Sequence, residues 1–240
     1  MGFHFTPKPD PSGTSTGTPS PAATASPSAA PPRDYPLQLL RDMLARLHAI
    51  DGPAASLMDD AQLKKLLQIQ ALGSTRVTSD PAECKDLLQA GSFSDDRIPT
   101  AAAKLGPAAT VTVITAASDA SGLYRKGMDS LQKAAENCSP ATLTEQGHTI
   151  SVRMTLVAPD LHGREAVGLA QTLTAEGSTV NLLRIVGMDG NLFITATKTI
   201  PTQQPEGKDI RELVHYVNEA FDNAANTPSS PKSSSTGVTA

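Results

Sequence analysis

The stretch 148–199 constrains the fold of this chain more than any other, because apolar and polar side chains alternate along it. Such alternation is typical of strands with one buried face, and four runs show it, at 149–156, 165–174, 179–186 and 192–196. The third run is apolar on both faces, which predicts a central strand. Asp189-Gly190 marks a hairpin turn before the fourth run. The stretch therefore predicts an antiparallel meander of four strands.

Five further segments show the three-to-four spacing of amphipathic helices. They are 37–47, stopped by Gly52-Pro53; 59–73; 80–91, with Asp80 as N-cap; 119–138, capped by Asp119; and 210–221. A further strand is predicted at 110–116, whereas residues 92–109 show no clear pattern. The fold class is therefore α+β: an antiparallel meander packed by helices in a single domain with disordered tails.

The domain boundaries follow from composition. Residues 6–34 consist of Pro, Ser, Thr, Ala and Gly with almost no large apolar side chain. Such a segment cannot bury enough surface to offset the entropy of ordering it. We therefore predict a disordered tether at 1–34, a folded domain at 35–225 and a disordered tail at 226–240.

Charge and aromatic content argue against nucleic acid as a partner. The net charge is −4 and no stripe of Lys and Arg appears, so the sequence lacks the electrostatic footprint of a nucleic-acid-binding protein. Tryptophan is absent and aromatic residues make up 3% of the chain, which leaves few side chains for base stacking. No apolar run reaches the ~20 residues that span a bilayer.

The chain has two cysteines, Cys84 and Cys138, each at the end of a predicted helix. Their surroundings fit neither a zinc site nor a Cys-x-x-Cys redox motif. Three interpretations remain: a structural disulfide, two buried thiols, or a reactive thiol. The disulfide is favoured; it would close a loop of some 55 residues, stabilise the fold by roughly 4 kcal/mol and indicate an oxidising compartment.

No motif in the sequence points to catalysis. There is no Gly-x-Ser-x-Gly elbow, P-loop, dinucleotide fingerprint or His-Glu-x-x-His. Asp160 and His162 are the only candidates for an acid–base pair, and a polar turn between strands explains them equally simply. We therefore expect a protein that is not an enzyme, with no catalytic residues, no metal site and no cofactor.

Two arginines on predicted strands, Arg153 and Arg184, are candidate contacts for an anionic ligand. Arg184 shares a face with Val180, Leu182 and Val186. An arginine on a largely apolar face lies at a sheet edge or is held by a partner. A solvated or ion-paired arginine is the ordinary alternative at both positions.

Four features together give a family resemblance. They are the tether, the Ser79–Cys84 segment, the Glu136–Pro140 segment that ends a long helix, and a meander closed by a helix. The set resembles secreted lipoproteins of actinobacteria, especially mycobacteria, whose sensor domain is similar to the extracellular domain of the kinase PknH. The resemblance covers roughly residues 36–225. This chain departs from the kinase domain in having one cysteine pair rather than two.

The resemblance implies an antiparallel sheet packed by helices, with a groove for an unknown ligand. It implies a non-catalytic sensing or ligand-binding domain of the cell envelope that binds a small or lipidic ligand or a partner protein. A structural adaptor that binds another protein through its sheet is the alternative. The location implied is extracellular, in the cell envelope, with the membrane reached only through an N-terminal lipid anchor of the full-length precursor.

Overall fold

The computed structural model describes residues 33–50, 52–70, 77–90, 97–106, 112–119, 122–145, 147–200 and 204–227. All of them belong to one compact unit. The tether expected at 1–34 and the tail expected at 226–240 lie almost entirely outside the described residues.

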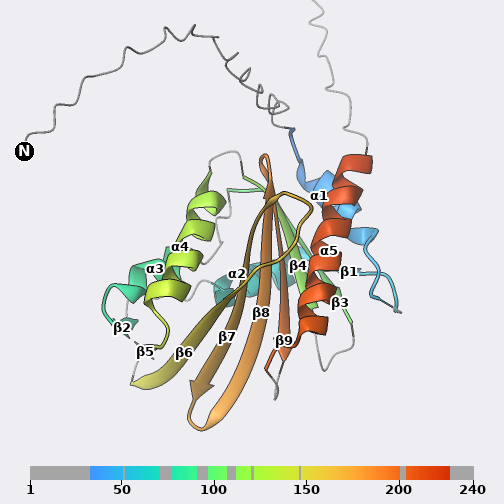
Figure 1. Ribbon diagram of the computed structural model, residues 1–240. Helices are drawn as coiled ribbons and strands as arrows, with labels where there is room; N and C mark the ends of the chain where they lie inside the picture. The colour runs from blue at the N-terminus through green and yellow to red at the C-terminus, as the bar shows by residue number, and fades with distance from the viewer. Residues whose placement is uncertain are drawn as a thin grey trace, which may run out of the picture. The chain divides into compact units, whose positions relative to one another are not determined.

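A nine-stranded antiparallel sheet forms the centre of this unit, in the order β1-β3-β4-β9-β8-β7-β6-β5-β2 (Figure 1). The strands are β1 (Ser56–Leu57), β2 (Thr78–Asp80), β3 (Thr100–Leu105), β4 (Thr112–Ser118), β5 (Ala141–Glu145), β6 (His148–Val157), β7 (Glu165–Ala175), β8 (Ser178–Asp189) and β9 (Leu192–Ile200). The predicted meander is confirmed as β6–β9. The predicted central strand is also confirmed, since β8 has four strands on either side.

Strand β8 continues three residues beyond the predicted end at Val186. Its last residue, Asp189, pairs with Leu192, which leaves Gly190 and Asn191 as a two-residue loop. Gly190 has a φ of 60°, the left-handed conformation that such hairpin loops require. The Asp-Gly signal thus located the turn correctly.

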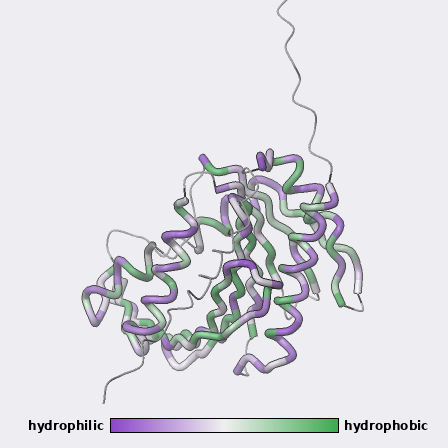
Figure 2. The backbone as a smooth tube through the Cα atoms, turned by 45° about the horizontal axis from the view of Figure 1, so that its top comes forward, coloured by the Kyte–Doolittle hydropathy of each residue, from purple (hydrophilic) through white to green (hydrophobic). Residues whose placement is uncertain are grey.

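Five helices cover the two faces of the sheet among the described residues: α1 (Leu37–Ala45), α2 (Asp60–Gln70), α3 (Cys84–Ala90), α4 (Leu123–Asn137) and α5 (Gly207–Asn226). Helices α1 and α5 pack on one face in a first hydrophobic core. Helices α3 and α4 pack on the other face in a second core. Apolar residues concentrate in the strands between these helices (Figure 2).

Helix α2 lies behind the sheet in Figure 1, on the side opposite α5. The predicted capping box at its start is present: Gln62 donates its backbone N–H to Asp59 Oδ1 at 2.8 Å, and Gln62 Oε1 accepts from the Asp59 N–H at 3.2 Å. Among the described residues, neither hydrophobic core includes a side chain of α2. The three leucines of its predicted apolar stripe, Leu63, Leu66 and Leu67, are half-buried.

Helix α1 ends at Ala45, so the predicted stop at Gly52-Pro53 is wrong. The chain leaves the helix because Leu47 accepts a backbone hydrogen bond from Ala55, and His48 bridges Ala54. Leu47 is nevertheless fully buried, as its spacing predicted.

Asp80 does not cap a helix, contrary to the prediction. It ends the edge strand β2, where it pairs with Thr142 of β5, and α3 begins only at Cys84. The Ser79 hydroxyl lies within hydrogen-bond distance of two carbonyl oxygens that follow, those of Pro81 (2.8 Å) and Ala82 (3.0 Å). Pairing with β5 therefore extends the strand to Asp80.

Candidate functional site

Arg184 lies on the central strand β8, with its side chain on the face that α4 partly covers. Its neighbours Leu183 and Ile185 point to the other face and belong to the core of α1 and α5. The next residue on its own face, Val186, belongs to the core under α4. Arg184 therefore stands at the border of the α4 core, on the face that the alternation predicted.

The Arg184 guanidinium has no partner within the described part of the chain. Its Nε is fully buried and makes no hydrogen bond. Burial lowers the pKa of the guanidinium, and no charged group offsets that effect. The side chain as a whole is half-buried. Because a charge taken partly out of water without a partner costs free energy, such an arginine needs an explanation.

Two threonine hydroxyls beside Arg184 are also unpaired. Thr197 of β9 lies directly across from Arg184, so their Cβ atoms are ~5 Å apart. Thr195 is the next residue of β9 on the same face, and the Oγ1 atoms of both threonines are buried without a hydrogen bond. Six buried side-chain N or O atoms of the described residues lack a hydrogen-bond partner, and three of them belong to this group. We refer to Arg184, Thr195 and Thr197 as the Arg184 site.

The Arg184 site has the chemistry of an anion receptor. A guanidinium donates two parallel hydrogen bonds to a carboxylate or phosphate, and neighbouring hydroxyls add further donors. None of the three side chains is a general base that could activate a hydroxyl as a nucleophile. The arrangement suits binding of an anion and offers nothing for covalent chemistry.

Arg153, the other arginine considered from the sequence, is not brought to this site. It lies on β6 across from Thr172, and Thr172 in turn pairs with Asn181, a neighbour of Leu182 on β8. By this register Arg153 points to the opposite face of the sheet from Arg184, and its side chain is exposed. Its role in ligand binding stays a prediction.

Asp160 and His162 form a polar turn. Asp160 Oδ1 accepts the backbone N–H of His162 at 3.0 Å, and both residues are exposed. This hydrogen bond uses the carboxylate to shape the loop between β6 and β7 and does not involve the imidazole ring.

A concavity of about 400 Å³ lies along the outer side of α5, away from the Arg184 site. It is lined by His162, Arg211, Val214, His215, Asn218, Glu219 and Asp222. His215 Nε2 lies 3.7 Å from Glu219 Oε2, and Asp222 lies 3.7 Å from Arg164. Acidic and basic groups balance one another here, so this concavity favours no charge of ligand.

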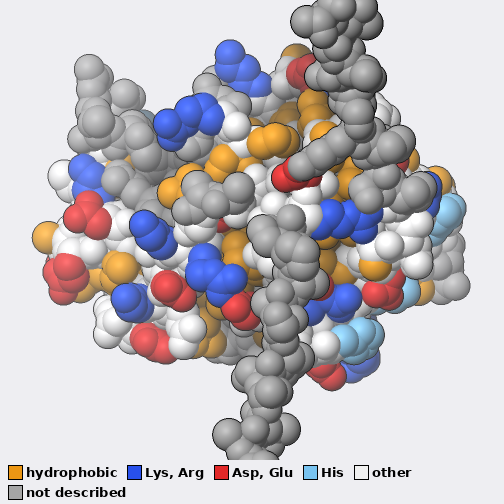
Figure 3. All heavy atoms as spheres, turned by 90° about the horizontal axis from the view of Figure 1, so that it is seen from above, with side chains coloured by type: hydrophobic (Ala, Val, Ile, Leu, Met, Phe, Trp, Pro, Cys, Tyr) orange, Lys and Arg blue, Asp and Glu red, His pale blue; other side chains and the backbone are white. Residues whose placement is uncertain are grey.

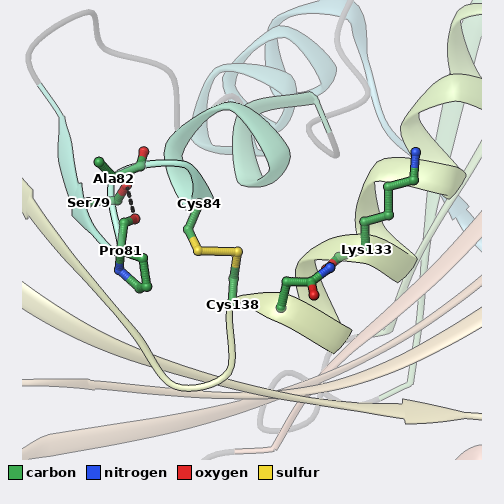
Figure 4. The surroundings of a disulfide bond; sticks show 7 residues. Ser79, Pro81, Ala82, Cys84, Lys133 and Cys138 are labelled. Carbon is green, nitrogen blue, oxygen red and sulfur yellow. Dashed lines mark hydrogen bonds between the residues drawn. A yellow bond between two sulfur atoms is a disulfide. The ribbon is translucent and has the colours of Figure 1, made fainter.

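The disulfide joins Cys84, at the start of α3, to Cys138, directly after α4 (Figure 4). Their Cα atoms are 5.6 Å apart, and both side chains are fully buried. Cys138 follows the stripe of α4 at the predicted position. The N-cap of α4 is Gly122 rather than the predicted Asp119, although Asp119 Oδ2 still accepts the backbone N–H of Tyr124 at 2.7 Å. The bond fastens α3 to α4, and so belongs to the core that borders the Arg184 site.

The described residues contain no cluster of three or more His, Cys, Asp or Glu side chains that could hold a metal ion. No helix in the described ranges combines the length and apolar character needed to cross a membrane. On the face in Figure 3, basic and acidic side chains are interspersed rather than separated by sign.

No protein-family model matches the chain. No curated protein matches it either. Solved structures with some similarity include an uncharacterised Mycobacterium smegmatis protein, an Rv0999 ortholog, at 13% identity with a TM-score of 0.44; the match covers 71% of this chain and 85% of that one. They also include the extracellular domain of PknH from Mycobacterium tuberculosis, at 10% identity with a TM-score of 0.45, covering 82% of this chain and 99% of that one.

Proposed function

We propose that this chain is a non-catalytic binding domain that holds a small anionic ligand at the Arg184 site. The observation that carries the proposal is a buried guanidinium nitrogen without a partner, beside two buried hydroxyls that also lack one. An anion bound there would supply the missing acceptors and the missing negative charge. The unliganded fold bears a cost that ligand binding would remove.

On this proposal the domain works outside the reducing cytoplasm, because a buried disulfide persists in oxidising compartments. A sensing or capturing role in the cell envelope, with the domain held to a lipid anchor by its N-terminal tether, agrees with the sequence resemblance. Binding without chemistry also agrees with the polar turn at Asp160 and His162.

The adaptor hypothesis receives less support from the sheet. Its two edge strands, β1 and β2, contain two and three residues. Such short edges offer little backbone for pairing with a strand of another protein.

Calorimetric titration with octanoate and with its neutral analogue octanamide tests the proposal. We expect octanoate to bind about 10–100-fold more tightly, the worth of a charge-assisted hydrogen bond, and Arg184→Gln to remove that preference. Arg153→Gln, an exposed arginine on the opposite face, is the matched control and should leave the preference intact. Equal affinities for the two compounds, or an equal loss in both variants, would reject the Arg184 site.

A further inference from the structure

The surroundings of Arg184 narrow the class of ligand, in an inference that rests on the proposed function. Arg184, Leu182 and Val180 follow one another on the same face of β8, and Leu173 of β7 lies across from Val180. Leu182 and Leu173 are half-buried, and Val180 is 38% exposed. An apolar strip therefore runs from the guanidinium toward the β7–β8 turn, over ~13 Å of strand.

Polar groups border this strip without interrupting it. Gln171 of β7 and Thr199 of β9 flank Leu182 in its row, and both are half-buried. Helix α2 lies on the same side of the sheet, opposite α5, and carries three half-buried leucines that join neither core (Figure 1). The face thus combines one charged end with an apolar length.

Among the described sheet residues, Arg184 is the charged side chain that lies at the apolar strip. Pairing aligns Arg184 with Thr197, then Val113 of β4, then Lys104 of β3. Among the described residues of the sheet, Lys104 is the nearest other cation on this face, ~14 Å away at three strand spacings. Lys198 points to the opposite face, where it pairs with Asp209. A ligand with two negative charges would therefore leave one unmatched, at a desolvation cost.

We propose that the ligand is an amphiphile with one ionised carboxylate, such as a long-chain fatty acid. The carboxylate accepts hydrogen bonds from Arg184, Thr195 and Thr197. The alkyl chain lies along Leu182, Val180 and Leu173. A ligand with one negative charge and one alkyl chain matches the charge of Arg184 and the apolar strip beside it. Short acids, neutral lipids and dianionic lipids each lack part of this match.

Titration of delipidated protein with acetate, octanoate, palmitate and octyl phosphate tests the inference. We expect affinity to rise more than tenfold from acetate to octanoate and again to palmitate, because each buried methylene strengthens binding by up to about fourfold. Octyl phosphate, mostly a dianion at neutral pH, should bind more weakly than octanoate.

Tail variants locate the chain. Val180→Asn should weaken palmitate binding about tenfold and leave acetate binding unchanged. Leu57→Asn is the matched control, since Leu57 is 40% exposed on β1 and its register places it on the opposite face. Urea unfolding of both variants checks that each is folded.

The outcomes separate the two proposals. If octanoate binds through Arg184 but acetate binds equally well, or Val180→Asn has no effect, the ligand is not an amphiphile and the anion site stands. If octyl phosphate binds more tightly than octanoate, the single-charge assignment is wrong. If Arg184→Gln leaves octanoate binding unchanged, the proposed function itself fails.

Discussion

Arg184 holds a positive charge on the sheet face without any counter-ion among the described residues, so removal of the charge should stabilise the empty protein. We predict that Arg184→Met, which keeps the length of the side chain, raises the free energy of unfolding by ~1–3 kcal/mol without ligand. Urea unfolding measures it. Arg153→Met, at an exposed position, should change stability by less than ~0.5 kcal/mol. A clear loss of stability in Arg184→Met would mean that the arginine has a structural role.

At the scale of the elements, α5 approaches β8 so closely that a glycine is required between them. A Cβ atom at Gly187 would lie 2.6 Å from Leu161 Cδ1 and 2.9 Å from Phe221 Cε2. We predict that Gly187→Ala lowers the free energy of unfolding by ~1–3 kcal/mol, because two buried side chains must move. Thermal or urea unfolding measures the change.

The control for this substitution is Gly207→Ala at the first residue of α5. A Cβ there meets only Arg211 Nη1, at 3.4 Å and at the end of a flexible side chain. It should leave stability unchanged or raise it slightly. Equal losses in the two variants would show that close packing of α5 on β8 is not the cause.

The start of α5 is fastened to β9 by a largely buried ion-pair group. Lys198 Nζ lies 2.8 Å from Asp209 Oδ1 and 2.7 Å from Glu212 Oε2. We predict that Lys198→Met costs ~2–4 kcal/mol of stability, because it leaves the buried Asp209 and the half-buried Glu212 without their cation. Lys208→Met, which breaks an exposed pair with Glu206, should cost less than ~1 kcal/mol.

The same group predicts the pH dependence of stability. Burial opposes ionisation of Asp209, yet hydrogen bonds from Lys198 and the backbone prevail and lower the pKa of its carboxyl. The stabilisation is therefore fully present above about pH 3.9, the pKa of an unfolded aspartate, and is lost as the pH falls through the lower folded pKa. Stability curves of the wild type and Lys198→Met should converge as the pH falls through that range. Parallel curves would mean that Asp209 does not depend on Lys198.

The alternation of side chains predicted the four strands of the meander and the face on which Arg184 lies, because alternation can be recognised within each strand separately. Strand β3 escaped prediction because Ala101, Ala102 and Ala103 carry no strand signal of their own. Two of them, Ala101 and Ala103, belong to the core of α1 and α5, where small side chains let a helix approach. Only the tertiary structure makes that stretch a strand.

The Arg184 site could be predicted only in part. Its arginine was identified, but Thr195 and Thr197 were not, because their closeness to Arg184 depends on the register of β8 against β9. The absence of a hydrogen-bond partner for Arg184 could not be predicted either, because it depends on how much of the sheet face α4 covers. A run of alternating threonines beside a strand with an inward arginine is the signal that sequence reasoning could have used.

At the scale of the whole molecule, the sheet separates two hydrophobic cores, and only one of them contains the disulfide. We predict that replacing both Cys84 and Cys138 by Ala lowers the free energy of unfolding by ~2–4 kcal/mol. The loss should be uneven, because α3 is held to α4 by the bond whereas α1 and α5 pack on the other face. Hydrogen exchange measures this element by element.

Amide protection should fall first in α3 and in the last turn of α4, and the amides of α5 should keep theirs until global unfolding. The Arg184 site borders the weakened core through Val186, so octanoate should also bind the double variant less tightly than the wild type. Because the sheet is shared, a single cooperative unit would instead lose protection on both faces alike. That result would mean that the two cores unfold together, and that the disulfide stabilises the whole domain rather than the side with the Arg184 site.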